Sequence, residues 1–193
     1  MRFYTADEHY GHDNYRGGIL SMCNRPFESL EDMTSQLIDR ANSKVTKDDF
    51  TWHCGDMFWR TMDVKEARRI LSALNGKHGL IIGNHDEVAL RIAGMFNSVH
   101  DTFFDQNTKP GVFLSHYAHR AWPKSHAGSY HVFGHTHAVL PDYRLSHDCG
   151  VDANGYFPMS FEELDRLMKS KGTLPPDEVQ LDMQRNTWDK AGQ

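Results

Sequence analysis

The sequence predicts an α/β protein, and three observations support this. Short runs rich in valine, phenylalanine and isoleucine alternate along the chain with helical patterns, as expected when strands and helices alternate. The length of 193 residues favours one domain, which would bury roughly 70% of its unfolded surface. A hydrophobic content of 39% and a charged content of 24% are typical of a globular chain rather than a disordered one.

Six short apolar runs are predicted to be strands. Their ranges are 2–5, 49–53, 79–82, 112–115, 130–133 and 143–149. The run 79–82 ends at Gly83, which is typical of a buried strand. The polar segment 105–111 is interpreted as a turn and not as a domain boundary.

Four helices are expected from capping residues and apolar spacing. Ser29 and Asp32 resemble a capping box, with Asp in place of the commoner Glu, whereas Glu163 completes a full box at the last helix. The second helix is closed by Asn75-Gly76. The four helices are predicted to begin at or just after Ser29, Asp63, Asp86 and Ser160.

The chain is predicted to form one domain over residues 1–172, followed by a polar C-terminal appendage over 173–193. The boundary is placed there because Leu174-Pro175-Pro176 breaks any helix and the residues beyond it are polar. No apolar run approaches the ~18–20 residues of a spanning helix. Asp7 and Glu8 interrupt any secretory core near the start. We therefore expect a cytoplasmic protein without a membrane partner.

The charge balance limits the partners. The formal net charge is −5, which disfavours a protein that coats nucleic acid through many phosphate contacts, although a nucleic-acid partner stays open. A phosphate substrate also stays open, because metal ions can supply positive charge. Three cysteines without a CxxC motif argue against a disulfide framework. The 13 histidines stand out, since histidine is the commonest metal ligand in proteins.

Five short polar clusters are the candidate functional motifs. Four of them follow directly on predicted strands, so they can converge beyond the carboxyl ends of a sheet. Glycines at 55, 83 and 134 allow tight turns and close backbone approach beside the candidate ligands. The clusters are Asp7-Glu8-His9, Gly55-Asp56, Gly83-Asn84-His85-Asp86, His116 and Gly134-His135-Thr136-His137.

The donor types in these clusters predict two metal ions. In extended chain, Asp7 and His9 point to the same side, as do His135 and His137, so each pair can bind one ion or two adjacent ions. Carboxylate, amide and imidazole donors without thiolate suit Mn, Fe, Co, Ni or Zn. Seven ligands exceed one tetrahedral site but fit two ions roughly 3.5–4 Å apart that share a carboxylate. The seven are Asp7, His9, Asp56, Asn84, His116, His135 and His137.

The order of these blocks resembles the calcineurin-like metallophosphoesterase superfamily. Gly-Asn-His-Asp followed by Gly-His-Thr-His is the most specific part of the likeness, and the blocks span residues 7–137. Three further segments are similar to a small, uncapped bacterial and phage branch of predicted phosphoesterases: Asp7–Asn14, 24–27 (Asn24-Arg25-Pro26-Phe27) and 150–156 (Gly150-Val151-Asp152-Ala153-Asn154-Gly155-Tyr156). The resemblance implies a four-layer sandwich, in which two mixed β-sheets pack face to face and are flanked by helices.

The resemblance also implies a role for each matching residue. The first ion is held by Asp7, His9 and His137, and the second by Asn84, His116 and His135. Asp56 bridges the two ions. His85 lies outside the metal shell and faces the substrate, and Asp86 orients His85 by hydrogen bonding. Mn²⁺ is favoured among the two divalent ions, with Fe, Ni, Co or Zn as alternatives.

These roles predict a metal-dependent phosphoric ester hydrolase acting on a small phosphoester. A metal-bridging hydroxide attacks phosphorus and His85 acts as general acid. His12, Arg25 and His119 are candidate substrate contacts, and Asp152 is a candidate partner of a ligand. A nucleotide or cyclic-nucleotide phosphodiesterase is favoured, because the site is expected to be open and to hold few anion-binding side chains. A phosphomonoesterase, a nuclease and a non-catalytic scaffold are the alternatives. The sequence leaves the oligomeric state open.

Overall fold

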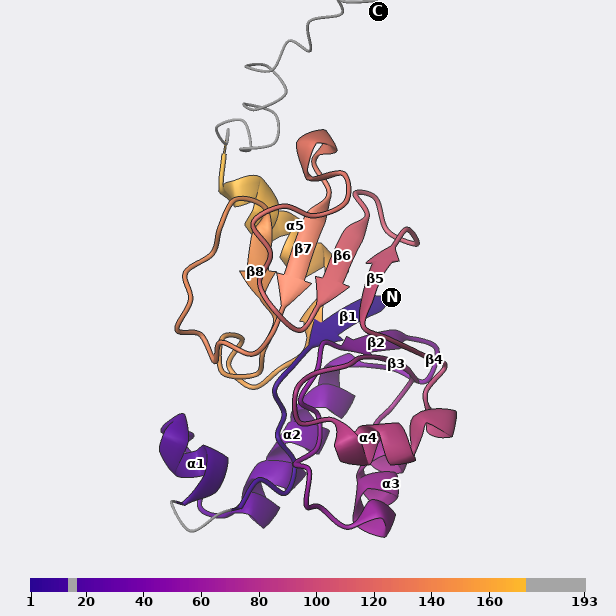
Figure 1. The fold of residues 1–193 in the computed structure, drawn as a ribbon, viewed down its shortest axis with the longest axis vertical. Coiled ribbons are helices and arrows are strands. Elements are labelled where there is room, and N and C mark those ends of the chain that lie inside the picture. Colours follow the sequence, from indigo (N-terminus) through magenta and orange to yellow (C-terminus); the bar gives the residue numbers. More distant parts are fainter. Residues whose placement is uncertain (14–16, 173–193) are drawn as a thin grey trace, which may run out of the picture.

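The structure of the chain is a computed structural model that describes residues 1–13 and 17–172. Two mixed β-sheets pack against each other and are flanked by helices (Figure 1). The α/β class predicted from the alternation of elements is therefore confirmed. The predicted appendage 173–193 lies outside the described residues. Within the described part, every helix is too short or too polar to cross a bilayer.

The first sheet has five strands in the order β4-β3-β2-β1-β9. Four of them are parallel, and the last is antiparallel to its neighbour. The strands are β1 (Arg2–Thr5), β2 (Phe50–His53), β3 (Lys77–Ile81), β4 (Ser98–His100) and β9 (Met159–Ser160).

The second sheet has four strands in the order β5-β6-β7-β8, of which only the first is antiparallel to its neighbour. They are β5 (Thr102–Asp105), β6 (Val112–Ser115), β7 (Tyr130–Phe133) and β8 (Ser146–Asp148). All six predicted strands are present, but β4, β5 and β9 were missed. Both β4 and β5 lie at sheet edges and are partly exposed, so they lack the continuous apolar run of a buried strand.

The four predicted helices begin where the sequence places them, whereas the short helix at 18–22 was not predicted. Ser160 and Glu163 make both bonds of a capping box. Ser29 accepts from the backbone N–H of Asp32, but the Asp32 carboxylate accepts from Glu28, so the reciprocal bond expected there is absent. The elements are α1 (Gly18–Met22), α2 (Leu30–Lys44), α3 (Val64–Ala73), α4 (Glu87–Arg91), α5 (Phe161–Ser170), η1 (Ala93–Met95) and η2 (Ser125–Ala127).

The core consists of two apolar clusters. The first includes Met33 of α2 and Ile70 of α3 and packs these helices and α4 against the first sheet. The second fills the space between the sheets and includes Trp52 of β2, Leu114 of β6 and Leu164 of α5. Burial of this apolar surface is the main force that holds the layers together.

The outer face of the second sheet differs from the four-layer expectation. Alternate side chains of a strand point to opposite faces, so Phe113 and His131 point away from the first sheet. His119 and Trp122 pack on them, with ring centroids 5.2 Å and 5.3 Å away. Among the described residues, this face is thus covered by an irregular segment that ends in the short η2 rather than by an α-helix.

The strand ends set the position of the candidate site. The arrowheads of β6 and β7 converge on the end of β1 (Figure 1). A backbone hydrogen bond of 3.0 Å from Val151 to Ala6 joins the two sheets at this edge. Each of the five polar clusters follows one of β1, β2, β3, β6 and β7. Ligands in α/β proteins bind at this kind of edge.

Candidate metal centre

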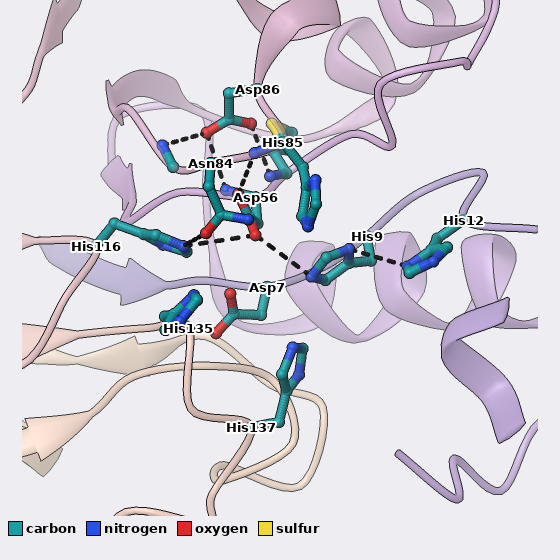
Figure 2. Close-up of polar contacts among 12 residues, drawn as sticks. Asp7, His9, His12, Asp56, Asn84, His85, Asp86, His116, His135 and His137 are labelled. Carbon is teal, nitrogen blue, oxygen red and sulfur yellow. Dashed lines mark hydrogen bonds and ion pairs between the residues drawn. The ribbon is translucent and has the colours of Figure 1, made fainter. Parts of the chain in front are cut away.

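The loops after β1 and β7 bring three ligand-type side chains together. Asp7, His9 and His137 each offer a nitrogen or oxygen atom, and these atoms lie within 4.8 Å of one another (Figure 2). Asp7 and His9 are buried and His137 is half-buried. These are the three residues expected to hold the first ion. We call them the first ligand group.

A second ligand group forms beside the first. Atoms of Asp56, His116 and His135 lie within 4.8 Å of one another. The Asn84 side chain joins them, since its Oδ1 lies 3.0 Å from Nε2 of His116. These residues follow β2, β3, β6 and β7, so four strand ends supply the group.

The Asp56 carboxylate lies between the two groups. Figure 2 shows the carboxylate in contact with the rings of His9 and His116. Its Oδ2 is 3.7 Å from Nε2 of His9 and 3.4 Å from Nε2 of His116. Its Oδ1 accepts the backbone N–H of His85 at 2.8 Å, which fixes the carboxylate. The expected bridging position is therefore where this side chain lies.

Two buried atoms of the first ligand group fit a cation. Over residues 1–13 and 17–172, Oδ1 of Asp7 and Nε2 of His9 have no hydrogen-bond partner. An unpaired buried polar atom costs about 1–3 kcal/mol. Burial raises the pKa of Asp7 to about 8 and lowers the pKa of His9 to about 2. A divalent cation would satisfy both atoms, because it favours the ionised carboxylate and the neutral imidazole.

Three glycines let the ligand loops approach closely. A Cβ on Gly55 would overlap Nδ1 of His116, and a Cβ on Gly83 would overlap Oδ1 of Asp56. A Cβ on Gly134 would lie 2.8 Å from Oδ2 of Asp7. The close approach predicted for these glycines is confirmed.

The backbone at the ligands is left-handed rather than extended. The φ angles are 56° at Asp7, 52° at His9, 70° at His135 and 45° at His137. The expectation that the chain is extended at these pairs is wrong, although Asp7 and His9 still belong to one ligand group. His135 and His137 belong to different ligand groups, as the resemblance implied. Such angles cost about 1–3 kcal/mol each and cluster at functional sites.

Hydrogen bonds from Nδ1 orient the ligand imidazoles. Nδ1 of His116 lies 3.0 Å from the carbonyl of Cys54, and Nδ1 of His137 lies 2.7 Å from Oδ2 of Asp152. In each ring Nε2 is thereby left for a metal. Burial lowers the pKa of His137, but the hydrogen bonds to Asp152 and Cys23 and the nearby charge of Asp7 together outweigh it and raise the pKa to about 10. Asp152 thus contacts a ligand, as the sequence suggested.

His85 lies at the site, but Asp86 does not orient its ring. Asp86 is buried and accepts the backbone N–H groups of Asp56, Met57 and Gly83 at 2.8–3.0 Å. Nδ1 of His85 is buried without a hydrogen-bond partner in the described part of the chain. The prediction that Asp86 orients His85 by a hydrogen bond is therefore wrong. Asp86 is engaged by three amides and instead holds together the loops that carry Asp56 and Asn84.

Two of the three candidate substrate contacts lie elsewhere. The Arg25 guanidinium is buried and bonded to protein atoms only, so the expectation that it binds a substrate phosphate is wrong. The His119 ring packs against Phe113 and His131 on the outer face of the second sheet, away from the ligand groups. His12 does line the site, where its Nδ1 lies 3.2 Å from Nδ1 of His9.

The ligand groups open into a cavity of about 380 Å³. Three apolar residues that the sequence reasoning did not assign to the site form part of its lining, namely Ile19, Met22 and Trp59. The Trp59 ring stacks on His12 with centroids 3.5 Å apart. Its position three residues after Asp56 was a usable signal. Ile19 and Met22 gave none, because α1 has only five residues and no periodic pattern.

The chain is similar in sequence to one protein and in structure to another, and neither is named for an activity. No protein-family profile matches the chain. An uncharacterized protein of Methanocaldococcus jannaschii is 36% identical over 85 residues, which cover 44% of this chain and 46% of that protein. The match thus spans about half the length of this curated relative. A protein of unknown function from Aquifex aeolicus has a similar crystal structure, with a TM-score of 0.69 and 24% identity over 86% of this chain and 98% of that one. This likeness shows a shared fold alone.

Proposed function

We propose that the chain is a dinuclear-metal-dependent phosphoesterase of the calcineurin-like superfamily that hydrolyses phosphodiester bonds of a nucleotide or cyclic nucleotide. The observation that carries the proposal is the Asp56 carboxylate. Its Oδ2 faces Nε2 of His9 in one ligand group and Nε2 of His116 in the other. A carboxylate shared by two groups of N and O donors is what two adjacent cations require.

The chain offers each cation a separate set of donors. Asp7, His9 and His137 would hold one ion, and Asn84, His116 and His135 the other, with Asp56 shared. Mn²⁺ is the favoured ion, because mixed oxygen and nitrogen sites of the superfamily that the sequence resembles commonly use it. The donor set itself, which lacks thiolate, suits Fe, Co, Ni and Zn as well. When bound, such ions act as Lewis acids towards phosphoryl oxygens and lower the pKa of a coordinated water.

His85 is the side chain that we assign to proton transfer. Its backbone N–H is tied to Asp56 and its ring lies 4.6 Å from the Trp59 ring, so its position relative to the bridging carboxylate is fixed. Because Nδ1 is buried, Nε2 is left to face the cavity. In the proposed reaction Nε2 gives its proton to the oxygen of the leaving group, and the His85 imidazole becomes neutral.

The charge of the lining favours a diester over a monoester. None of the described residues that line the cavity is lysine or arginine. A phosphomonoester dianion needs more compensating charge than a diester monoanion, and here that charge would come from the cations alone. The apolar side chains Ile19, Met22 and Trp59 give the leaving group of a diester a surface to contact.

The test is hydrolysis of bis(p-nitrophenyl) phosphate beside p-nitrophenyl phosphate. The protein is stripped with a chelator and assayed with and without Mn²⁺. We expect turnover of the diester that requires Mn²⁺ and is lost in Asp56→Asn, but not in Asp101→Asn, a matched change at an exposed residue outside the cavity lining. Turnover of the monoester alone would favour a phosphatase. No turnover of either ester with both ions bound would favour a scaffold.

A further inference from the structure

Two sequence segments contribute no metal ligand, yet they lie directly behind the first ligand group. They are 24–27 and 150–156. The rings of Phe27 and Tyr156 pack edge to face with centroids 4.9 Å apart. Beside them the Arg25 side chain, which is fully buried, makes a bidentate ion pair with Asp152 at 2.7 Å and 2.8 Å. We call Arg25 and Asp152 the brace.

Arg25 uses every donor that a guanidinium has. Its five N–H groups contact five acceptors, so none is left for a substrate. Besides the two Asp152 oxygens, Nη2 donates to the carbonyl of Asp7 at 2.7 Å, and Nη1 donates to the carbonyl of Glu8 at 2.9 Å and to Sδ of Met33 at 3.4 Å. The planar fork of arginine matches this arrangement, whereas a lysine ammonium has three donors and no fork.

These bonds fix the loop that carries two ligands. Asp7 and His9 both have left-handed backbone angles, with φ of 56° and 52°. Arg25 holds the carbonyls of Asp7 and Glu8, the two peptide groups between these ligands. The N–H groups of Asp7 and His9 also donate to the carbonyls of Gly55 and Asp56 at 3.0 Å. Removing the two Arg25 bonds would therefore loosen the loop without releasing it, and the side chains of Asp7 and His9 would be held less firmly.

The other half of the brace acts on the third ligand. Asp152 Oδ2 accepts from Nδ1 of His137 at 2.7 Å and from Arg25 at the same distance. Arg25 therefore sets where the Asp152 carboxylate lies, and Asp152 sets which way the His137 ring points. The buried Arg25 guanidinium thus contacts the loop of Asp7 and His9 directly, and it contacts His137 through the Asp152 carboxylate.

We propose that Arg25 and Asp152 are positioning residues that determine how tightly the first ligand group holds its cation and leave the second group unaffected. The inference rests on the proposed metal centre, but not on any substrate or activity. The second group has its own supports: the Cys54 carbonyl holds the His116 ring, and Asp86 holds the loops of Asp56 and Gly83.

The brace includes Asp152, which belongs to a third set of possible metal donors. Cys23, His137 and Asp152 have atoms within 4.8 Å of one another. Both oxygens of Asp152 are already bound by the positive Arg25 guanidinium. A cation at this position would have to displace Arg25 or lie beside it. We therefore assign Asp152 to support of His137 and not to a third metal.

The test compares Arg25→Lys and Asp152→Asn with Arg40→Lys in the full chain. Arg40 is a matched control, because it donates to the carbonyl of Gly155 in the same loop but contacts no ligand. Mn²⁺ binding is measured by titration and by the EPR signal of the spin-coupled pair. We expect two ions in the native chain and in Arg40→Lys. In each brace variant one ion should bind about 10–100-fold more weakly, which is typical when a partner of a metal ligand is lost.

The His137→Ala variant shows whether the loss of Mn²⁺ affinity is confined to the first ligand group. His137→Ala should retain the ion of the second group, and adding Arg25→Lys should leave its affinity unchanged. Unchanged affinities in both brace variants, or equal loss at both ions, would overturn the inference. Circular dichroism of each variant shows that the chain is folded. If the native chain itself binds no Mn²⁺, the proposed metal centre fails, and the brace inference fails with it.

Discussion

The His85 imidazole lies beside the Trp59 indole, with ring centroids 4.6 Å apart and an interplanar angle of 49°. The Trp59 ring is itself stacked against the His12 ring. The position of His85 in the cavity wall is therefore set by packing and by its backbone bond to Asp56, rather than by a carboxylate at Nδ1. This arrangement separates His85, the residue proposed for proton transfer, from the two ligand groups, which makes its proposed role testable.

His85→Ala should retain both cations and lose turnover. The side chain belongs to neither ligand group, so Mn²⁺ stoichiometry should equal that of the native chain. Loss of a positioned general acid lowers the rate by about 10²–10⁴-fold. Diester hydrolysis and metal content, measured on the same preparation, check this. Normal turnover in the variant would show that the leaving oxygen is protonated by another group.

Asp86→Asn should destabilise the fold. The Asp86 carboxylate accepts three backbone N–H groups, and an amide in its place would turn its NH₂ group towards one of these donors. Leaving a buried donor unpaired costs about 1–3 kcal/mol. Denaturant unfolding should show this loss, together with weaker Mn²⁺ binding. A variant with native stability and a defect in turnover alone would instead restore the role of Asp86 as a partner of His85.

Gly83→Ala should disrupt the metal centre more than Gly94→Ala. A Cβ on Gly83 would overlap the Asp56 carboxylate, whereas a Cβ on Gly94 meets no atom within 4 Å. The Asp56 carboxylate must therefore move in the first variant and not in the second. We expect Gly83→Ala to bind fewer than two Mn²⁺ ions and Gly94→Ala to bind two. Equal metal content in both variants would show that the close approach at Gly83 is not needed.

His131 should make the stability depend on pH. Burial lowers the pKa of this imidazole from its ordinary 6.5 to about 4, and its ring nitrogens lie 3.1 Å from the Phe113 carbonyl and the His119 amide. Below pH 6.5 the unfolded chain takes up a proton there, whereas the folded chain does not until about pH 4. The free energy of unfolding should therefore decrease as the pH is lowered from about 6.5 to about 4, by at most about 1.4 kcal/mol per pH unit.

The comparison with His131→Gln isolates this group, because other buried histidines with lowered pKa values, such as His78, act in the same direction. Unfolding by denaturant at pH 7 and pH 5 should show a smaller difference in the variant. The chelator-treated protein is used, so that metal release does not contribute. An unchanged difference would mean that His131 is protonated in the folded chain as well.

The sequence was most informative where strand ends carry polar residues. Runs of buried apolar residues followed by glycine located β3 and β7, and the polar residues after them include candidate ligands that the structure brings together. The short edge strands β4 and β5 had no such pattern. Local sequence also could not show that the backbone is left-handed at Asp7 and His135, where an extended chain was expected.

Contacts between residues far apart in the chain could not be predicted from local sequence either. Arg25 and Asp152 lie 127 positions apart, and nothing local distinguishes a buried, paired arginine from one that binds phosphate. The same holds for Asp86, whose three amide partners come from two different loops. Only the tertiary structure fixes which donors an acceptor meets.

The most direct test of two cations bridged by Asp56 is anomalous scattering from crystals of the native chain soaked in Mn²⁺. We predict two peaks, one beside Asp7, His9 and His137 and one beside Asn84, His116 and His135, with the Asp56 carboxylate bonded to both. Crystals of Asp56→Asn treated in the same way should lose at least one peak. A single peak in the native chain, or peaks that leave Asp56 unbound, would contradict the dinuclear centre.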